Sequence, residues 1–262
     1  MNRDLFPVHE VFASIQGEGA FVGEPQVFVR LEGCPLRCTW CDTPKTWRLP
    51  HAEATLDDPA FAGERAWVSP ERIADWVERV DPGGERAVSL TGGEPLMWPE
   101  LPARLKPLLG VRRLHLETAG AFPEALAEVL PHIDHASADL KLPADLAAPV
   151  PLAAERGPFP AAPADAAAWT DQRRAVLSSL AGRDACLKLV VAAGRALEDY
   201  EPLLADAAEL APASTLFLQP VTPRSGAHEP GPELLESLTA RAAQEGLTVR
   251  VQPQLHVSLG LR

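Results

Sequence analysis

The sequence of 262 residues predicts an α/β fold, in which parallel strands and helices form an open, partial barrel of the TIM type. Runs typical of short buried strands alternate with helical periodicity about six times, which is too few for a closed eight-stranded barrel. Polar motifs follow four of these strands and begin at Thr91, Glu117, Asp139 and Gln219. Since ligands bind at the carboxyl ends of parallel strands, we expect these motifs to lie at one rim and around one site.

The first two expected strands, 8–15 and 26–31, flank a glycine-rich loop at 16–23. The loop has the spacing G-x-G-x-x-x-G, which is one residue too long for a dinucleotide-binding loop, and a strand rather than a helix follows it. Dinucleotide binding is therefore excluded here. Two interpretations stay open: a simple hairpin turn, or a loop whose glycines let the backbone come close to a ligand.

The rest of the chain alternates between helices and strands. Ser69 and Pro70 are a typical N-cap and first-turn pair, and begin a helix. Its apolar residues recur at helical spacing at Ile73, Trp76, Val77 and Val80. Further helices are expected at 99–109, 122–130, 169–182, 196–210 and 232–245. Further strands are expected at 87–91, 112–116, 185–191, 215–219 and 248–251, and one more ends at Asp139.

Two segments lack a clear period. Residues 48–68 are expected to be irregular, and residues 143–168 hold six prolines and many alanines. The second segment is predicted to be an exposed insertion or a flexible loop. We expect a single domain over residues 1–262, interrupted only by this insertion.

Composition narrows the class of protein. The hydrophobic fraction of 46% is enough for a sizeable core, and no run of apolar residues is long enough for a transmembrane helix. The first residues lack the apolar stretch of a signal peptide. With a formal net charge of -12 and a pI of about 5.0, the chain is not expected to bind a nucleic-acid backbone directly. We expect a cytoplasmic protein with reduced thiols and no membrane partner.

Three of the four cysteines, Cys34, Cys38 and Cys41, lie close together in the pattern C-x3-C-x2-C. Three thiolates can hold three irons of a [4Fe–4S] cluster, which leaves the fourth iron open to a small molecule. A zinc site completed by His9 or His51 is a weaker alternative, because zinc sites generally use paired C-x2-C units. Disulfides are less favoured still, since nothing indicates an oxidising compartment.

The cysteine pattern with an aromatic residue before the last cysteine, here Trp40, resembles the signature of the radical S-adenosylmethionine superfamily. Gly92-Gly93-Glu94-Pro95 is similar to the second motif of that superfamily. The resemblance implies a radical SAM core that binds a [4Fe–4S] cluster and S-adenosylmethionine. It also implies that S-adenosylmethionine is held by Trp40, Gly92, Gly93, Glu94, Asp139, Lys141 and Gln219.

Further motifs resemble the 7-carboxy-7-deazaguanine synthase family and extend over almost the whole chain. They are Ile15-Gln16-Gly17-Glu18-Gly19, Phe28-Val29-Arg30, Trp40-Cys41-Asp42-Thr43 and Gln254-Leu255-His256. The resemblance implies conversion of 6-carboxy-5,6,7,8-tetrahydropterin to 7-carboxy-7-deazaguanine with release of ammonia, on the route to queuosine and other 7-deazapurines. It also implies a flavodoxin or ferredoxin as reductant and a homodimer.

The same resemblance assigns the substrate side of the site. Thr43 would bind a Mg2+ ion that also touches the substrate carboxylate. The pterin would be contacted by Ile15, Gln16, Gly17, Glu18, Arg30, Thr91, Glu117, His256 and the terminal carboxylate of Arg262. For Arg30 a plain ion pair with Glu32 or another neighbour is the alternative, and for Glu117 it is an ion pair at a strand end.

Two other functions stay open at this point. An activating enzyme that forms a glycyl radical on a partner protein would share the cysteine and Gly-Gly-Glu-Pro motifs. A non-enzymatic metal-binding module would need only the cysteines.

Overall fold

The computed structural model describes residues 4–56, 58–153, 157–223 and 227–261. A nine-stranded sheet runs through it in the order β11-β10-β9-β7-β6-β5-β2-β1-β4. The strands are β1 (Phe6–Ile15), β2 (Pro25–Leu31), β4 (Trp67–Val68), β5 (Ala87–Gly92), β6 (Leu114–Thr118), β7 (His135–Asp139), β9 (Ala185–Val191), β10 (Thr215–Pro220) and β11 (Val249–Val251). Every neighbouring pair from β2 to β11 is parallel, whereas β1 is antiparallel to both β2 and β4.

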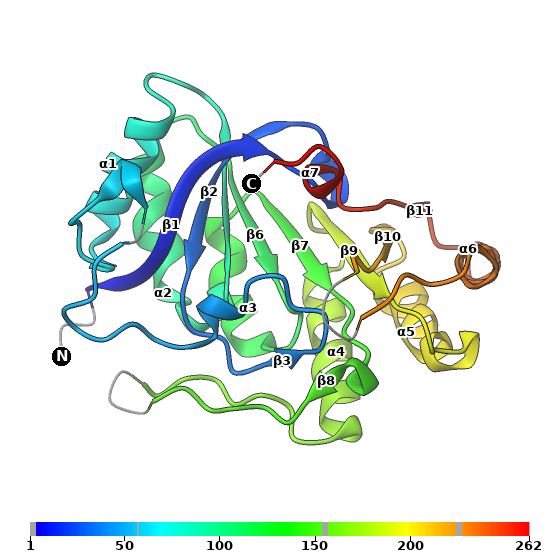
Figure 1. The fold of residues 1–262 in the computed structure, drawn as a ribbon. Helices are drawn as coiled ribbons and strands as arrows, with labels where there is room; N and C mark the ends of the chain where they lie inside the picture. The colour runs from blue at the N-terminus through cyan, green and yellow to red at the C-terminus, as the bar shows by residue number, and fades with distance from the viewer. Residues whose placement is uncertain (1–3, 57, 154–156, 224–226, 262) are drawn as a thin grey trace.

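Helices connect the parallel strands along the outside of the curved sheet (Figure 1). They are α1 (Pro70–Val80), α2 (Glu100–Leu105), α3 (Pro123–Val129), α4 (Ala166–Leu180), α5 (Leu197–Leu210) and α6 (Pro232–Gln244). The short helix α7 (Leu255–Ser258) lies instead near the end of β1 (Figure 1). An open α/β barrel is therefore confirmed, with the sheet left unclosed between β11 and β4. Among the described residues, none of the helices has the length and apolar character needed to cross a membrane.

Most of the expected elements are present within a few residues. Two helices end early where a proline follows: Pro107 and Pro131 each lie in a short 3-10 turn after α2 and α3. Helix α4 begins earlier than expected because the side chain of Asp165 accepts a hydrogen bond from the backbone N–H of Ala168.

The two segments without a period are more ordered than their sequences indicate. The stretch 48–68 was expected to be irregular, yet it contains β4. The proline-rich stretch contains β8 (Leu146–Ala147), which pairs with β3 (Arg37–Cys38) in the cysteine loop. Its partly buried residues Leu152 and Phe159 pack against the core. Most other described residues of this stretch are exposed, as predicted, but it is anchored to the site rather than detached from it.

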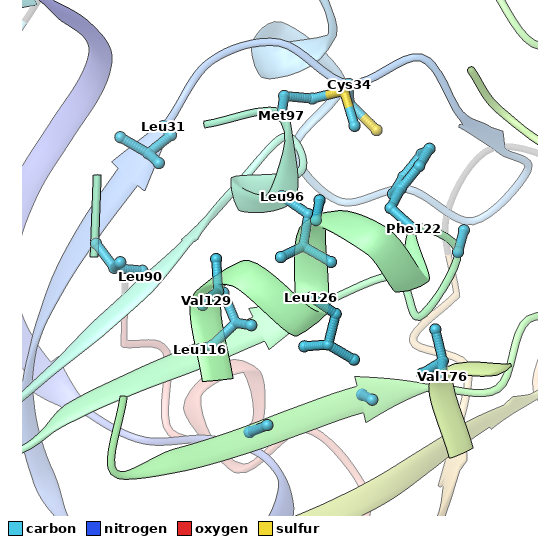
Figure 2. Close-up of a cluster of buried hydrophobic side chains, with 14 of the residues drawn as sticks. Leu31, Cys34, Leu90, Leu96, Met97, Leu116, Phe122, Leu126, Val129 and Val176 are labelled. Atoms are coloured by element: carbon cyan, nitrogen blue, oxygen red, sulfur yellow. The ribbon is translucent and has the colours of Figure 1, made fainter. Parts of the chain in front are cut away.

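Successive side chains of a strand point to opposite faces of the sheet, so the apolar core lies on one face and the site on the other. Leu90, Leu116, Leu187, Leu189 and Leu218 are fully buried under the helices. The alternate residues of these strands point to the other face of the sheet, and those that line the pocket include the polar residues Thr91, Glu117, Lys188 and Gln219. Figure 2 shows part of the apolar layer, in which Leu126 and Val129 of α3 pack with Leu96 and Leu116 and the cluster reaches Cys34. The cysteine loop thus rests directly on the core.

We predict that Leu126→Ala lowers the free energy of unfolding by about 2–5 kcal/mol, because Leu126 is fully buried and its loss leaves a cavity. Leu108→Ala is the matched control, since Leu108 is 43% exposed and its change is expected to stay under about 1 kcal/mol. Urea unfolding under anaerobic conditions measures both. Equal losses in the two variants would contradict the packing described here.

Candidate active site

One pocket of about 190 Å3 lies at the rim of the sheet and under the cysteine loop. The strand-end positions lining it are Thr91 and Gly92 of β5, Glu117 of β6, Asp139 of β7 and Gln219 of β10, so the prediction of one common rim is confirmed. The other predicted residues that line it are Ile15, Gln16, Gly17, Glu18, Arg30, Cys34, Cys38, Trp40, Cys41, Thr43, Gly93, Lys141 and His256. Arg262 lies outside the described residues.

The cysteine loop is held by backbone hydrogen bonds on both sides. The N–H groups of Gly33 and Cys34 donate to the carbonyls of Thr46 and Trp47, at 2.8 and 3.2 Å. The guanidinium of Arg37 donates to the carbonyls of Cys34 and Leu36 and lies over the Trp47 ring. All three thiols are free and reach the pocket, so the spacing has placed three sulfur ligands on one loop as predicted.

Burial favours the neutral form of two of these thiols, Cys34 and Cys38. Burial raises the pKa of Cys34 to about 12, with a further contribution from the carboxylate of Glu94. Burial also raises the pKa of Cys38, although the nearby Lys141 ammonium acts in the opposite direction. Since only thiolates ligate iron well, metal binding here must displace protons.

Trp40 faces the pocket with an unused hydrogen-bond donor. Its indole packs against a small apolar cluster that includes Val190 and Val221. On the other side, the Lys141 ammonium lies 4.3 Å from the ring centroid and also pairs with Asp139. The Trp40 Nε1 atom is buried and has no hydrogen-bond partner among the described residues. A buried N–H left unpaired is costly, so this position fits a bound molecule with an acceptor, such as S-adenosylmethionine.

Gly92 and Gly93 bring the second motif into backbone contact with the cysteine loop. A Cβ atom on Gly92 would meet the carbonyl oxygen of Leu31 at 2.2 Å, and one on Gly93 would meet that of Gly33 at 2.6 Å. The φ angle of +126° at Gly92 is also one that L side chains rarely adopt. Both positions therefore require glycine.

Glu94 makes contacts of its own in this structure, and its role toward S-adenosylmethionine stays a prediction. It was expected to face S-adenosylmethionine, but its side chain is fully buried and does not line the pocket. Its carboxylate accepts hydrogen bonds from the backbone N–H groups of Leu96 and Ala119 and from the Thr118 hydroxyl, at 2.7 to 3.0 Å. In this structure Glu94 joins the second motif to the end of β6, because protein donors already surround its oxygens.

The floor of the pocket centres on Glu117. Its Oε1 accepts from the Gln16 amide at 2.7 Å and from the Ser89 hydroxyl at 3.2 Å, and its Oε2 accepts from the Thr91 hydroxyl at 2.9 Å. The strand-end ion pair that was the alternative for Glu117 is absent from the contacts described here. The carboxyl group is instead held by neutral donors.

Charged side chains cross the pocket as a continuous chain. The Lys188 ammonium lies 2.7 Å from a Glu18 oxygen and 3.4 Å from an Asp139 oxygen, and Asp139 also pairs with Lys141. Burial alone would raise the pKa of Glu18, but Lys188 and a hydrogen bond from Gln254 lower it to about 2. Neither Lys188 nor Gln254 was assigned to the site from sequence. The sequence could have indicated Lys188, because it is the single charged residue in an otherwise apolar strand. In that strand it alternates with the buried residues Leu187 and Leu189, so its side chain points to the opposite face of the sheet.

Arg30 and His256 were both predicted to contact the pterin, and the structure places them in different surroundings. Arg30 lines the pocket, but its Nε lies 2.6 Å from Glu10, so the ion-pair alternative describes its contact here, with Glu10 rather than Glu32 as partner. His256 lies against Gly17, where a Cβ atom would meet its Nδ1 at 1.9 Å. The backbone N–H of Leu255 also donates to the Gly17 carbonyl at 3.0 Å, so α7 docks on the loop after β1.

One group of side chains could hold a metal ion. Donor atoms of Glu18, Asp42 and His256 all lie within 4.8 Å of one another. The Thr43 hydroxyl donates to Asp42 at 3.2 Å and adds another oxygen beside them. Oxygen-rich groups of this kind suit a hard cation such as Mg2+.

Comparison with known proteins decides the family. Residues 28–147 match the model of the radical SAM superfamily. The chain is 33% identical to 7-carboxy-7-deazaguanine synthase from Methanothermobacter thermautotrophicus over 98% of each chain, and 33% identical to that from Geobacter sulfurreducens over 99% of each. The chain belongs to the 7-carboxy-7-deazaguanine synthase family. It is thus a radical SAM enzyme, and the family implies a [4Fe–4S] cluster and S-adenosylmethionine, which the three thiols and the unpaired Trp40 donor fit.

Solved structures support the fold. The QueE protein from Escherichia coli matches with a TM-score of 0.57 at 23% identity, over 95% of this chain and 94% of that one. A radical SAM methyltransferase from Sphaerobacter thermophilus gives the same TM-score at 16% identity, over 95% of this chain and 77% of that one. Members of the 7-carboxy-7-deazaguanine synthase family thus share this open barrel with other radical SAM enzymes.

We predict that Glu94→Gln removes a pH-dependent component of stability. Burial raises the pKa of Glu94 from 4.5 to about 6. The folded chain therefore binds this proton more tightly than the unfolded chain, and the stabilisation is full below pH 4.5 and lost as the pH rises through 6. As the pH rises from below 4.5 to above 6, the free energy of unfolding of the wild type should fall by about 2 kcal/mol relative to that of the variant.

Chemical unfolding at several pH values measures this difference. Glu128→Gln, at an exposed position on α3, is the control and should follow the wild type. A difference between wild type and Glu94→Gln that stays constant from pH 4.5 to 7 would show that Glu94 does not titrate in this range.

Proposed function

We propose that this enzyme converts 6-carboxy-5,6,7,8-tetrahydropterin to 7-carboxy-7-deazaguanine and ammonia by radical ring contraction, in the biosynthesis of queuosine and other 7-deazapurines. The observation that carries the proposal is the content of a single pocket. Three free thiols, Glu117 and the loop from Ile15 to Glu18 all line it. A radical generated beside the thiols would therefore have a polar heterocycle within reach. The names of the relatives that match over almost the whole chain support the same product.

On the cofactor side, Cys34, Cys38 and Cys41 would hold the [4Fe–4S] cluster. With S-adenosylmethionine, the cluster supplies a 5′-deoxyadenosyl radical that can take a hydrogen atom from the substrate. Trp40 would lie against the adenine and donate its free N–H. The glycine backbone at Gly92 and Gly93 would approach the methionine part closely. Asp139, Lys141 and Gln219 complete this side of the pocket.

On the substrate side, Glu117 would accept hydrogen bonds from the guanidine-like edge of the pterin. Arg30 would bind the substrate carboxylate by exchanging Glu10 for it, a geometry that the planar guanidinium favours. Thr91, His256 and the loop from Ile15 to Glu18 would enclose the rings and exclude water. The terminal carboxylate of Arg262 is proposed as a further contact.

A Mg2+ ion is proposed beside Thr43 and Asp42, where it would also touch the substrate carboxylate. Glu18 and His256 lie near enough to bind it directly or through water. The ion would fix the carboxylate and balance its charge during the reaction. We further propose a single-domain, homodimeric, cytoplasmic enzyme. It would accept electrons from a flavodoxin or a ferredoxin and would not bind nucleic acid directly.

We predict turnover of the carboxypterin by the reconstituted protein under anaerobic conditions, with S-adenosylmethionine, Mg2+ and a reductant but no partner protein as substrate. Chromatography should detect 7-carboxy-7-deazaguanine and one equivalent of ammonia. Cys38→Ala is the control and should be inactive, because it removes a cluster ligand. Absence of the deazapurine, together with a radical formed on a second protein, would favour an activating enzyme. Zinc in place of iron would favour a metal-binding module.

We predict that Thr43→Ala reduces the stimulation of turnover by Mg2+ by roughly tenfold or more, as expected when a metal ligand is lost. Thr39→Ala is the matched control in the same loop, since the Thr39 side chain is exposed and does not line the pocket. Initial rates over a range of Mg2+ concentrations measure the effect. An unchanged Mg2+ response in Thr43→Ala would remove Thr43 from the metal site.

A further inference from the structure

Beneath the pocket, a row of buried polar side chains leads from Glu117 to His115. Gln16 donates from Nε2 to Glu117 and also to the Gln26 carbonyl oxygen, at 2.7 and 3.3 Å. The Gln26 Nε2 atom lies 3.3 Å from His115 Nδ1. Gln26 is fully buried, and His115 is 3% exposed. No sequence motif indicated Gln26 or His115, and neither is among the residues that line the pocket itself.

The direction of these hydrogen bonds is fixed at the pocket end. A carboxylate such as Glu117 can only accept, and the backbone N–H of Glu18, which lies 3.1 Å from Gln16 Oε1, can only donate. The Gln16 amide therefore has one orientation, with its nitrogen toward Glu117 and Gln26. Gln26 must present its oxygen to Gln16, which turns its own nitrogen toward His115. His115 must then accept at Nδ1 and carry its proton at Nε2.

Two further observations agree with a neutral His115. Burial lowers the pKa of His115 to about 4, and the neighbouring His135 and Arg113 add to this effect. A hollow of about 10 Å3, lined by His115, His135 and Ser137, leaves room for roughly one water molecule to accept the Nε2 proton. Phe21 stacks on the His115 ring with 4.5 Å between the ring centroids, so the imidazole plane is also fixed.

We propose that Gln16, Gln26 and His115 form a one-way relay of hydrogen bonds that orients Glu117 toward the donor edge of the substrate. Both amide protons of Gln16 are used within the relay, so Gln16 acts as a positioning residue rather than as a direct donor to the pterin. His115 is the terminal acceptor at which the row ends. The identity of the substrate here rests on the proposed function.

Two variants of His115 separate the relay from simple packing. His115→Phe keeps a ring for Phe21 to stack on but removes the Nδ1 acceptor, which leaves the Gln26 amide unpaired. His115→Asn loses the ring but keeps an acceptor oxygen close to the position of Nδ1. The relay requires that Asn replaces His115 better than Phe, whereas a packing role requires the reverse order.

Steady-state kinetics of the reconstituted holoenzyme tests this order. In His115→Phe we expect the KM for the carboxypterin to rise about tenfold with little change in kcat, as for the loss of uniform substrate binding. In His115→Asn the KM should return to within about threefold of the wild type. Cleavage of S-adenosylmethionine without pterin should be the same in all three proteins, because that side of the pocket is untouched.

The outcomes are distinguishable. A wild type that does not turn over the pterin overturns the proposed function. A wild type that does, with an unchanged KM in His115→Phe or a higher KM in His115→Asn than in His115→Phe, overturns the relay. An independent readout is the 15N spectrum of labelled histidine in the oxidised holoprotein, with His115 assigned by its loss in His115→Asn. The relay requires Nδ1 to be unprotonated and Nε2 to carry the proton, and the opposite tautomer overturns it.

Discussion

The site depends on a buried chain of alternating charges, Glu18, Lys188, Asp139 and Lys141. These residues come from the loop after β1, from the end of β7 and the residues that follow it, and from the middle of β9, so the chain of charges joins the loop after β1 to β7 and β9. Removing Lys188 would leave Glu18 without its cation, and removing Asp139 would leave Lys141 without its anion, which is far more costly than losing a surface ion pair. The positions of the loop and the two strands are therefore coupled through charge as well as through backbone hydrogen bonds.

The fold was largely predictable because the parallel strands carry two signals at once. Their outward positions are continuous with the apolar core, and their final inward residues are polar. The described part of the stretch 48–68 is mostly irregular as predicted, and only the short strand β4 at its end was missed, since β4 is held by pairing with β1 rather than by its own sequence pattern. The proline-rich segment was misjudged for a similar reason: pairing of β8 with β3 and the contact of Phe159 with Trp98 depend on partners distant in sequence.

The site was predictable where chemistry demands rare residues at fixed spacing. Three cysteines, an aromatic residue and two glycines can be identified from sequence, because few other arrangements need them. Glu94 illustrates the limit: its motif is recognisable, but only the structure shows that backbone N–H groups occupy its oxygens. Gln26 and His115 had no motif at all. Their importance arises from contacts across β1, β2 and β6, which no local pattern encodes.

The raised pKa of the Cys34 thiol bears on how the site would bind its cluster. The cysteine loop rests on the apolar core, so burial favours the neutral form of that sulfur, and binding of iron there would have to displace its proton. Lys141 acts against this effect at Cys38, and the same ammonium lies over Trp40 and pairs with Asp139. A bound cluster would add negative charge near Lys141, the residue at which the chain of alternating charges ends. The Lys141 ammonium therefore acts on two parts of the site: it favours the thiolate form of Cys38, and through Asp139 and Lys188 it is linked to Glu18.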